Sequence, residues 1–342
     1  MKAAQASSRI KVLIVTPCLN SARYIDETIA SVVAQSGDFD IHYHIQDGGS
    51  TDATVDRLKI WAARLEPGTS GIPSGAPIYI SWASEKDASM YEGIQKGFDA
   101  LLGSGLLSEE DRVVMSWINA DDQFTLHAFQ TVTRFLSEYP GEHWVTGIVS
   151  VVREDGCIAG MRIGPLGYGR AALARGIHDG RILPFVGQEG TFWTLELWQR
   201  CGGWRPGIRY AGDWDLWRRM AGQARLVNLI AVLGHHRRRP GQISQDMARY
   251  WTELDALLQS EPTVDMDRVG YPAATTWEDY DRASVAAWDS STQQWKLYGE
   301  SLRREGLLHC FSDCLVSSWS RYGWGRWLIT TYRRWRGIEI EP

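Results

Sequence analysis

The sequence predicts an α/β protein with a mostly parallel central sheet flanked by helices. Over residues 1–150, short continuous apolar runs alternate with segments in which apolar residues recur every three to four positions. Such alternation is typical of parallel strands joined by helices that cover both faces of the sheet. Acidic segments follow three of the apolar runs, at the end of the sheet where ligands of such proteins bind.

The first strand is expected over Ile10–Thr16, a continuous apolar run that Pro17 ends. Asn20 or Ser21 can cap the next helix, because a short polar side chain there can accept a hydrogen bond from a free backbone N–H. The apolar face of that helix comprises Tyr24, Ile25, Thr28, Ile29, Val32 and Val33.

The same alternation continues along the chain. A second strand is expected over Ile41–Gln46, and a helix runs from near Thr51 or Asp52 to about Leu65. The next elements are a loop over Pro67–Pro77, a strand over Ile78–Ala83, a helix striped by Met90, Ile94, Phe98 and Leu101, a strand over Val113–Ile118, a helix with Leu126, Phe129, Val132 and Leu136, and a hairpin of Trp144–Val152 and Ile158–Ile163. Later helices are expected over Asp246–Gln259 and, as one or two helices, over Thr276–Arg304.

Composition excludes some classes of protein. The net charge of −5 opposes binding to nucleic acid. The five cysteines form no Cys-x-x-Cys pair, which favours a reducing compartment over a disulfide framework. The apolar run near the N-terminus is too short for a signal peptide, and no segment reaches the ~20 apolar residues that cross a bilayer. A cytoplasmic protein is expected.

The three acidic segments are Gln46-Asp47-Gly48-Gly49, Ser84-Glu85-Lys86-Asp87 and Asn119-Ala120-Asp121-Asp122. Because the carboxyl ends of parallel strands meet at one edge, these segments predict a polar site that binds a cation. An ordinary turn is the alternative for Asn119–Asp122.

Six segments, in this order, resemble the inverting family 2 glycosyltransferases. They are VTPCLNSARYIDETIASVVAQ, IQDGGSTDAT, SEKDASMYEGIQKGF, WINADDQF, QEGTFWTLELWQRCGGW and AGDWDLWRRM. The resemblance covers roughly residues 10–245. It implies the A-type glycosyltransferase fold, a nucleotide-sugar donor, most commonly UDP-linked, and Mn²⁺ or Mg²⁺ as cofactor.

The resemblance assigns roles to the acidic segments. Asp121 stands where the family has its metal-binding acid, and hard oxygen ligands suit Mg²⁺ or Mn²⁺ beside a diphosphate. Asn119 replaces an acid that many members carry, and its amide can touch the ribose. Asp47 is expected to bind the base, in a pocket also lined by Pro17. Asp87 is expected to contact the nucleoside or sugar, or else to act as a carboxylate at a helix N-terminus.

The base that deprotonates the acceptor hydroxyl is expected in the segment AGDWDLWRRM. If this segment is helical, Asp213 and Asp215 point about 200° apart, so only one can face the donor. Asp213 matches the family's base, Gly212 replaces the acid that precedes it, and Asp215 is expected to pair with Arg218 or Arg219.

Other residues are assigned by the same resemblance. Gln188 and Glu189 are expected to contact the donor sugar, and Trp214 to stack on the acceptor. Trp193 is either an acceptor platform or a core residue. Many members carry a histidine, which contacts the metal or the diphosphate, where Arg239 stands. Either His236 reaches the metal instead, or Arg239 binds the diphosphate.

The resemblance predicts a catalytic domain over 1–245, with nucleotide-sugar binding in 10–122 and acceptor binding and catalysis in 123–245. A helical extension is expected over 246–342. Its tail, 315–337, combines tryptophan with arginine and predicts either a docked helix or peripheral contact with the inner face of a membrane. The expected activity is transfer of a sugar to a glycan or lipid-linked acceptor in polysaccharide biosynthesis. A non-catalytic protein that binds a nucleotide sugar or a glycan and a nucleotidyltransferase are the alternatives.

Overall fold

The computed structural model describes residues 9–65, 75–162, 167–242, 245–260 and 283–298. Their helices and strands up to Leu297 belong to one compact unit. Within these ranges, no helix is long and apolar enough to cross a bilayer.

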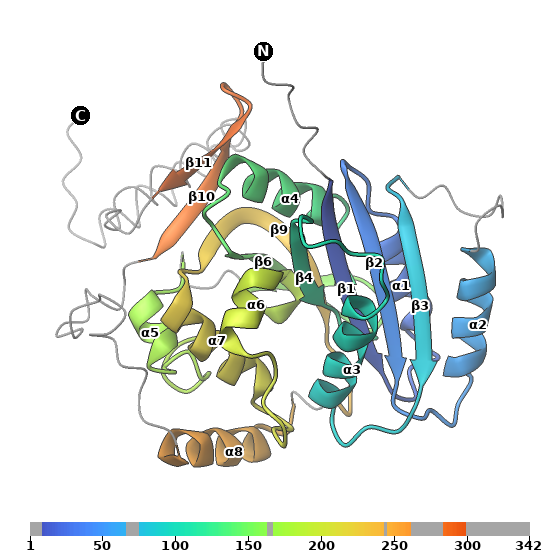
Figure 1. Ribbon diagram of the computed structural model, residues 1–342. Helices are drawn as coiled ribbons and strands as arrows, with labels where there is room; N and C mark the ends of the chain where they lie inside the picture. The colour runs from blue at the N-terminus through green and yellow to red at the C-terminus, as the bar shows by residue number, and fades with distance from the viewer. Residues whose placement is uncertain (1–8, 66–74, 163–166, 243–244, 261–282, 299–342) are drawn as a thin grey trace, which may run out of the picture. The chain divides into compact units, whose positions relative to one another are not determined.

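The first half of the chain forms the predicted alternation of strands and helices (Figure 1). Its elements are β1 (Ile10–Cys18), α1 (Ile25–Val33), β2 (Phe39–Asp47), α2 (Thr54–Arg64), β3 (Ile78–Ser84), α3 (Met90–Leu102), β4 (Val113–Trp117), β5 (Gln123–Phe124) and α4 (Ala128–Glu138). The boundaries differ from the predicted ones by a few residues. Neither Asn20 nor Ser21 caps α1, because the helix begins three to four residues later, after Tyr24. The Asn20 side chain instead accepts a hydrogen bond from the backbone N–H of Thr51, at 2.8 Å.

The second half adds further strands and helices. They are β6 (Trp144–Val152), β7 (Ile158–Arg162), α5 (Arg170–Ala174), the 3₁₀ helix η1 (Gln188–Gly190), β8 (Thr191–Thr194), α6 (Leu195–Cys201), α7 (Gly212–Gln223), β9 (Val227–Arg237), α8 (Met247–Ser260), β10 (Ser284–Asp289) and β11 (Gln294–Tyr298).

All of these strands join one sheet, in the order β11-β10-β9-β6-β8-β4-β1-β2-β3, with β5 beside β9 and β7 beside β6. Strands β4, β1, β2 and β3 are mutually parallel, and so are β6, β9 and β10. The short strand β8 runs antiparallel to both of its neighbours and joins the two parallel sets. The prediction of a mostly parallel sheet flanked by helices is confirmed.

Each face of the sheet has its own hydrophobic core. Alternate residues of β1 point to opposite faces, so that Ile14 packs with α1, α2 and α4 while Val15 packs with α3, α6 and α7. The second core contains a cluster of buried tryptophans: Trp117, Trp144, Trp193, Trp198, Trp204 and Trp217. Neighbouring rings in this cluster have centroids 5.2–6.0 Å apart.

The prediction of helices over Thr276–Arg304 is wrong for the described part, 283–298. That part forms β10 and β11, which extend the sheet beyond β9. Val285 and Ala286 are buried where β10 pairs with β9, and Trp295 packs edge-on against Phe135 of α4. These contacts are distant in sequence and override the helical propensity of the alanines. The tail at 315–337 lies outside the described residues.

Candidate active site

The candidate site lies where β1, β2 and β4 end together. The strands are parallel, and Cys18 at the end of β1 is level with Asp47 at the end of β2. Pro17, one residue earlier, is buried in β1. The segment Asn119–Asp122 follows β4 at the same edge, as the topology predicted.

Asp47 organises its own loop. Its carboxylate accepts hydrogen bonds from the backbone N–H groups of Gly49 (3.2 Å) and Ser50 (3.0 Å), from the Ser50 hydroxyl, and from the Ser84 hydroxyl (2.7 Å). The side chain is fully buried. In the described conformation, Asp47 therefore shapes the turn after β2 and offers no exposed oxygen to a ligand. Direct contact of Asp47 with a nucleobase stays a prediction.

Asp87 lies against Gly48 of the same loop. Partial burial raises the pKa of its carboxyl, and the negative charges of Glu92 and Asp47 raise it further, against the opposing effect of Lys96. Asp47 and Asp87 thus form one acidic group at the edge of the sheet. The structure gives this group no direct contact with Asp121.

Asp121 is paired with Arg239. Its Oδ2 accepts hydrogen bonds from Arg239 Nε at 2.6 Å and from Gln242 Nε2 at 3.2 Å. The Asp121 side chain is 11% exposed and that of Arg239 is 32% exposed, so the ion pair lies at the boundary of protein and solvent. Gln242 also donates to the backbone carbonyl of Arg237, at 2.6 Å, which fixes its orientation.

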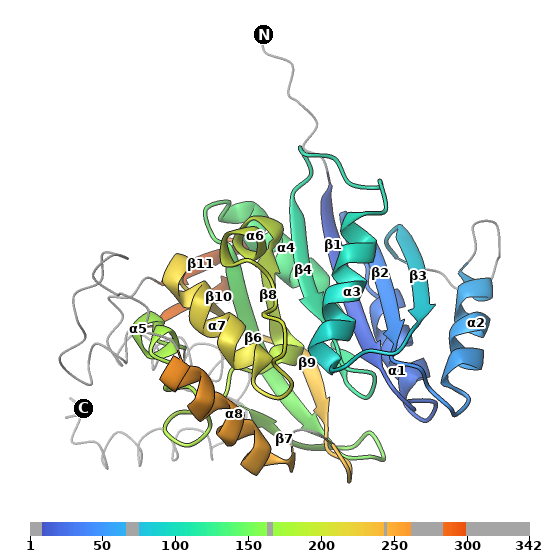
Figure 2. The same ribbon diagram turned by 60° about the horizontal axis from the view of Figure 1, so that its bottom comes forward.

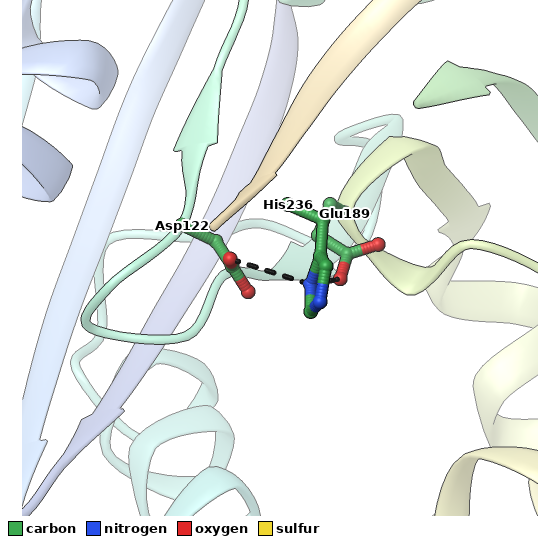
Figure 3. A group of neighbouring side chains, drawn as sticks. All are labelled: Asp122, Glu189 and His236. Carbon is green, nitrogen blue, oxygen red and sulfur yellow. Dashed lines mark hydrogen bonds and ion pairs between the residues drawn. The ribbon is translucent and has the colours of Figure 1, made fainter. Parts of the chain in front are cut away.

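Asp122 belongs to a second, more deeply buried cluster with Glu189 and His236 (Figure 3). Nδ1 of His236 lies 2.8 Å from Glu189 Oε1 and 3.5 Å from Asp122 Oδ1. The three residues come from the loop after β4, from η1 and from β9. Gly234 permits this meeting, because a Cβ there would lie 2.3 Å from the backbone oxygen of Glu189.

The charges in this cluster balance one another. Burial disfavours protonation of His236, but Glu189 and Asp122 outweigh burial and raise its pKa to about 10. Burial raises the pKa of Asp122 to about 6, against the lowering effect of His236. At neutral pH a histidinium therefore lies between two carboxyl groups, and the cluster is an internal salt bridge.

A divalent cation was predicted on Asp121 and His236, and the described side chains do not fit that pair. Asp121 is engaged by Arg239, while His236 faces Glu189 and Asp122. The set Asp122, Glu189 and His236 could hold a metal ion, since its ligand atoms all lie within 4.8 Å of one another. Asp122 is, however, already used: Oδ1 accepts from the Arg237 N–H at 2.8 Å, and Oδ2 from Asn119 Nδ2 at 3.2 Å.

Asp213 lies in the first turn of α7, as predicted. Its Oδ1 accepts a hydrogen bond from the N–H of Trp214 at 2.8 Å and lies 3.2 Å from the Tyr91 hydroxyl. Burial raises the pKa of Asp213 to about 6; the contacts with Trp214 and Tyr91 oppose this, and the charge of Glu189 adds to it. A carboxyl with this pKa is a competent general base at neutral pH.

The neighbours of Asp213 have structural roles. Asp215 is 1% exposed and pairs with Arg219 (2.8 Å) and Arg205 (3.4 Å), so the predicted pairing with Arg219 is present. At position 212 a Cβ would lie 2.7 Å from the Tyr91 ring. This close contact explains why glycine, rather than an acid, precedes Asp213.

Gln188 is buried and both polar atoms of its side-chain amide lack a hydrogen-bond partner among the described residues. A buried amide without partners is costly, and a ligand is one way to satisfy it. This observation supports the predicted contact with the donor, and the sequence alone did not reveal it.

The two predicted acceptor platforms are core residues. Trp193 is fully buried within the tryptophan cluster, where Trp117 and Trp217 pack against its ring. Trp214 is 4% exposed, and its Nε1 donates to the carbonyl of Gly176 at 2.9 Å. Neither ring presents an open face in the described conformation, and the acceptor role of both stays a prediction.

Two residues near the site were not predicted. Arg237 is 1% exposed, pairs with Glu27, and donates from Nε to the backbone oxygen of Asp121 at 3.0 Å. Arg237 follows His236 and begins a run of three arginines. Alternation of side chains along β9 is the one sequence signal that distinguishes buried Arg237 from exposed Arg238.

Glu253 of α8 is the second. Its carboxylate accepts hydrogen bonds from three successive backbone N–H groups just before α7, those of Arg209 (2.8 Å), Tyr210 (2.6 Å) and Ala211 (2.8 Å). Figure 2 shows α8 beside α7, and Leu254 packs with Trp214. No local sequence pattern indicates this contact, because the two segments are more than forty residues apart.

Comparisons with known proteins agree with this geometry. Residues 13–156 match the model of Glycosyl transferase family 2, and the resemblance seen in the sequence is confirmed there. The PGL/p-HBAD biosynthesis glycosyltransferases of Mycobacterium bovis (strain BCG / Pasteur 1173P2) and Mycobacterium tuberculosis (strain ATCC 25177 / H37Ra) are each 29% identical over 137 residues. The match covers 40% of this chain and 44% of each relative, so it spans less than half of the relatives' length.

The fold is also that of a solved structure. The crystal structure of S. aureus TarS 1–349 in complex with UDP-GlcNAc superimposes with a TM-score of 0.53 at 12% sequence identity. The superposition covers 76% of this chain and 69% of that one. The A-type glycosyltransferase fold is thereby confirmed.

Proposed function

We propose that this chain, whose residues 13–156 match glycosyltransferase family 2, transfers a sugar from a nucleotide-sugar donor to an acceptor hydroxyl with inversion of configuration. One observation carries the proposal: Asp213 is a partly buried carboxyl in the first turn of α7, 3.2 Å from the Tyr91 hydroxyl of α3, and its pKa is raised to about 6.

The reaction requires one base and one departing group. Asp213 takes the proton of the acceptor hydroxyl while the acceptor oxygen attacks the anomeric carbon of the donor sugar. A new C–O bond forms, the bond to the donor's diphosphate breaks, and the nucleoside diphosphate leaves with the bonding electron pair. One displacement inverts the configuration, and no covalent intermediate with the protein forms.

The donor is proposed to lie across the loops after β1, β2 and β4. Pro17 and the loop that Asp47 shapes would border the nucleoside, with Asp87 and Asn119 at its sugar. Gln188 and Glu189 would face the transferred sugar. A UDP-linked donor is proposed from the resemblance, and the related TarS structure contains UDP-GlcNAc. The proposal does not depend on Mn²⁺ or Mg²⁺, because Arg239 already pairs with Asp121.

A glycan or lipid-linked acceptor is proposed from the resemblance as well. The cytoplasmic location and the contact of 315–337 with a membrane stay predictions, and that segment lies outside the described residues.

The test combines donor binding with transfer. UDP-, GDP- and dTDP-sugars are screened by thermal shift, where ligand at 100 times its dissociation constant adds about 2.7 kcal/mol of stability. With the donor that binds, release of nucleoside diphosphate is measured for the wild type, Asp213→Asn and Asp255→Asn. Asp255 is a half-exposed residue of α8 that pairs with Arg181 and serves as the control.

Loss of release in Asp213→Asn, with donor binding and the control unchanged, is the expected result. Equal release by wild type and Asp213→Asn would contradict the assignment of the base. Donor binding without release in any protein would favour a non-catalytic binding protein. Release of pyrophosphate from a nucleoside triphosphate would indicate a nucleotidyltransferase.

A further inference from the structure

The Asp121–Arg239 ion pair lies where the sequence predicts a divalent cation. Arg239 Nε is 2.6 Å from Asp121 Oδ2, and Gln242 Nε2 is 3.2 Å from the same oxygen. This oxygen therefore already has two donors, one of which carries a full positive charge. A dication bound to it would have to displace the guanidinium and then remain close to it.

The buried cluster of Asp122, Glu189 and His236 does not supply a cation for the diphosphate either. His236 faces both carboxyl groups of its cluster, and both oxygens of Asp122 accept hydrogen bonds from the protein, from Arg237 and Asn119. These three side chains are 1–7% exposed. They are enclosed and internally paired, whereas a diphosphate needs a cation that solvent can reach.

Arg239 meets that need. Its side chain is 32% exposed, and only its Nε edge is used by Asp121. Nη1 makes a long contact of 3.5 Å with the carbonyl of Pro240, and Nη2 donates to no acceptor in the described part of the chain. A guanidinium keeps its charge at all relevant pH values and binds phosphate oxygens through two parallel N–H groups.

Asp121 and Gln242 would then orient this cation. The carboxylate holds one edge of the guanidinium and leaves the other available. Two hydrogen bonds with Arg237 hold the pair in place. Arg237 Nε donates to the backbone oxygen of Asp121, and the Arg237 carbonyl accepts from Gln242 Nε2. A guanidinium fixed in this orientation is preorganised to bind a diphosphate.

We propose that Arg239 is the built-in cation for the donor's diphosphate and that nucleotide binding by this chain does not require a divalent metal. This inference rests on the proposed function, since it assumes a nucleoside diphosphate as ligand. Asp121 acts as the positioning residue of Arg239.

The experiment measures binding of UDP, GDP and dTDP to the full chain by calorimetry, in EDTA and separately in Mn²⁺. The proteins are the wild type, Arg239→Gln, Arg239→His and the control Arg238→Ala. Arg238 is exposed and adjacent, and its side chain contacts no acceptor in the described part of the chain. Arg238→Ala removes one positive charge, as Arg239→Gln does. The nucleoside of the best-binding nucleotide serves as a probe without phosphate.

The expected result for the wild type is a dissociation constant that differs less than about twofold between EDTA and Mn²⁺. Arg239→Gln should weaken nucleoside diphosphate binding about 10- to 100-fold, the range for lost charged hydrogen bonds, while nucleoside binding stays unchanged. Arg239→His removes the competing charge from Asp121 and should bind the diphosphate more tightly in Mn²⁺ than in EDTA.

Several outcomes would overturn the inference. Wild-type binding that EDTA abolishes and Mn²⁺ restores would show a metal-dependent site. Equal losses of nucleotide affinity in Arg239→Gln and Arg238→Ala would show that the effect depends on net charge rather than on Arg239. If none of the nucleotides binds to the wild type with or without Mn²⁺, the proposed function itself fails, and the inference fails with it.

Discussion

The hydroxyl of Tyr91 lies 3.2 Å from Oδ1 of Asp213 and 3.1 Å from the carbonyl oxygen of Tyr210. The hydroxyl has one proton, so these two oxygens share it. Tyr91 belongs to α3, and Asp213 to α7. The contact therefore joins α3, in the part of the chain proposed to bind the nucleotide, to the helix that carries the proposed base.

The first prediction concerns the pH dependence of transfer. Asp213 acts as a base only when ionised, so kcat/KM should fall as the pH decreases through about 6, the pKa of this carboxyl. The Tyr91 hydrogen bond stabilises the ionised form of Asp213. Its loss in Tyr91→Phe should therefore shift the acid limb of the kcat/KM profile to higher pH. Rate profiles from pH 5 to 9 test this, and identical limbs in both proteins would contradict it.

The second prediction concerns the stability cost of the same carboxyl. The pKa of Asp213 is raised in the folded state, so ionisation destabilises the fold as the pH rises from about 4 to about 6. Asp213→Asn should be more stable than the wild type by up to about 3 kcal/mol at pH 8 and about equally stable at pH 3.5. Urea denaturation at both pH values measures the difference in the free energy of unfolding. A stability gain of the same size at both pH values would have a cause other than ionisation of Asp213.

Asp215 should matter for stability rather than chemistry. It is 1% exposed, and its loss leaves the Arg219 guanidinium, whose side chain is only 12% exposed, without its carboxylate partner. Such a change typically costs about 3–5 kcal/mol. Asp215→Asn is therefore expected to lower the midpoint of denaturation strongly, while the exposed-pair variant Asp255→Asn changes it little. A stable Asp215→Asn protein without activity would reverse the roles given to the two acids of α7.

Glu253 should position the base without touching the ligand. Its carboxylate anchors the three backbone N–H groups before α7, and a glutamine has only one oxygen for them. Glu253→Gln is expected to lower kcat about tenfold while the dissociation constant of the donor stays unchanged, since a displacement of about 1 Å can cost this much or more. Equal weakening of donor binding and kcat would indicate general unfolding.

Trp193 should behave as a core residue. Trp193→Ala is expected to destabilise the fold by about 3–5 kcal/mol, whereas Trp193→Phe should keep the KM for the acceptor unchanged. A selective rise of the acceptor KM in Trp193→Phe would instead favour the predicted acceptor role.

The sequence was most informative where structure is local. Apolar periodicity located the helices and strands of residues 10–162 within a few residues, and the acidic segments located the edge of the sheet. It failed where long-range pairing decides: β10 forms only because β9 offers a neighbour. Glu253 likewise has a role only because α8 folds back onto α7. Arg239 was visible as a departure from the family, but its partner was not.

The tryptophan cluster has an optical consequence. Trp217 lies on α7 one turn after Asp213, and its ring stacks on Trp117 of β4, with centroids 5.6 Å apart. Indole rings so close together couple their electronic transitions and exchange excitation energy. A shift of α7 against the sheet would therefore change the near-ultraviolet circular dichroism and the emission of the chain, so that movement around the proposed base can be followed in real time without an attached dye.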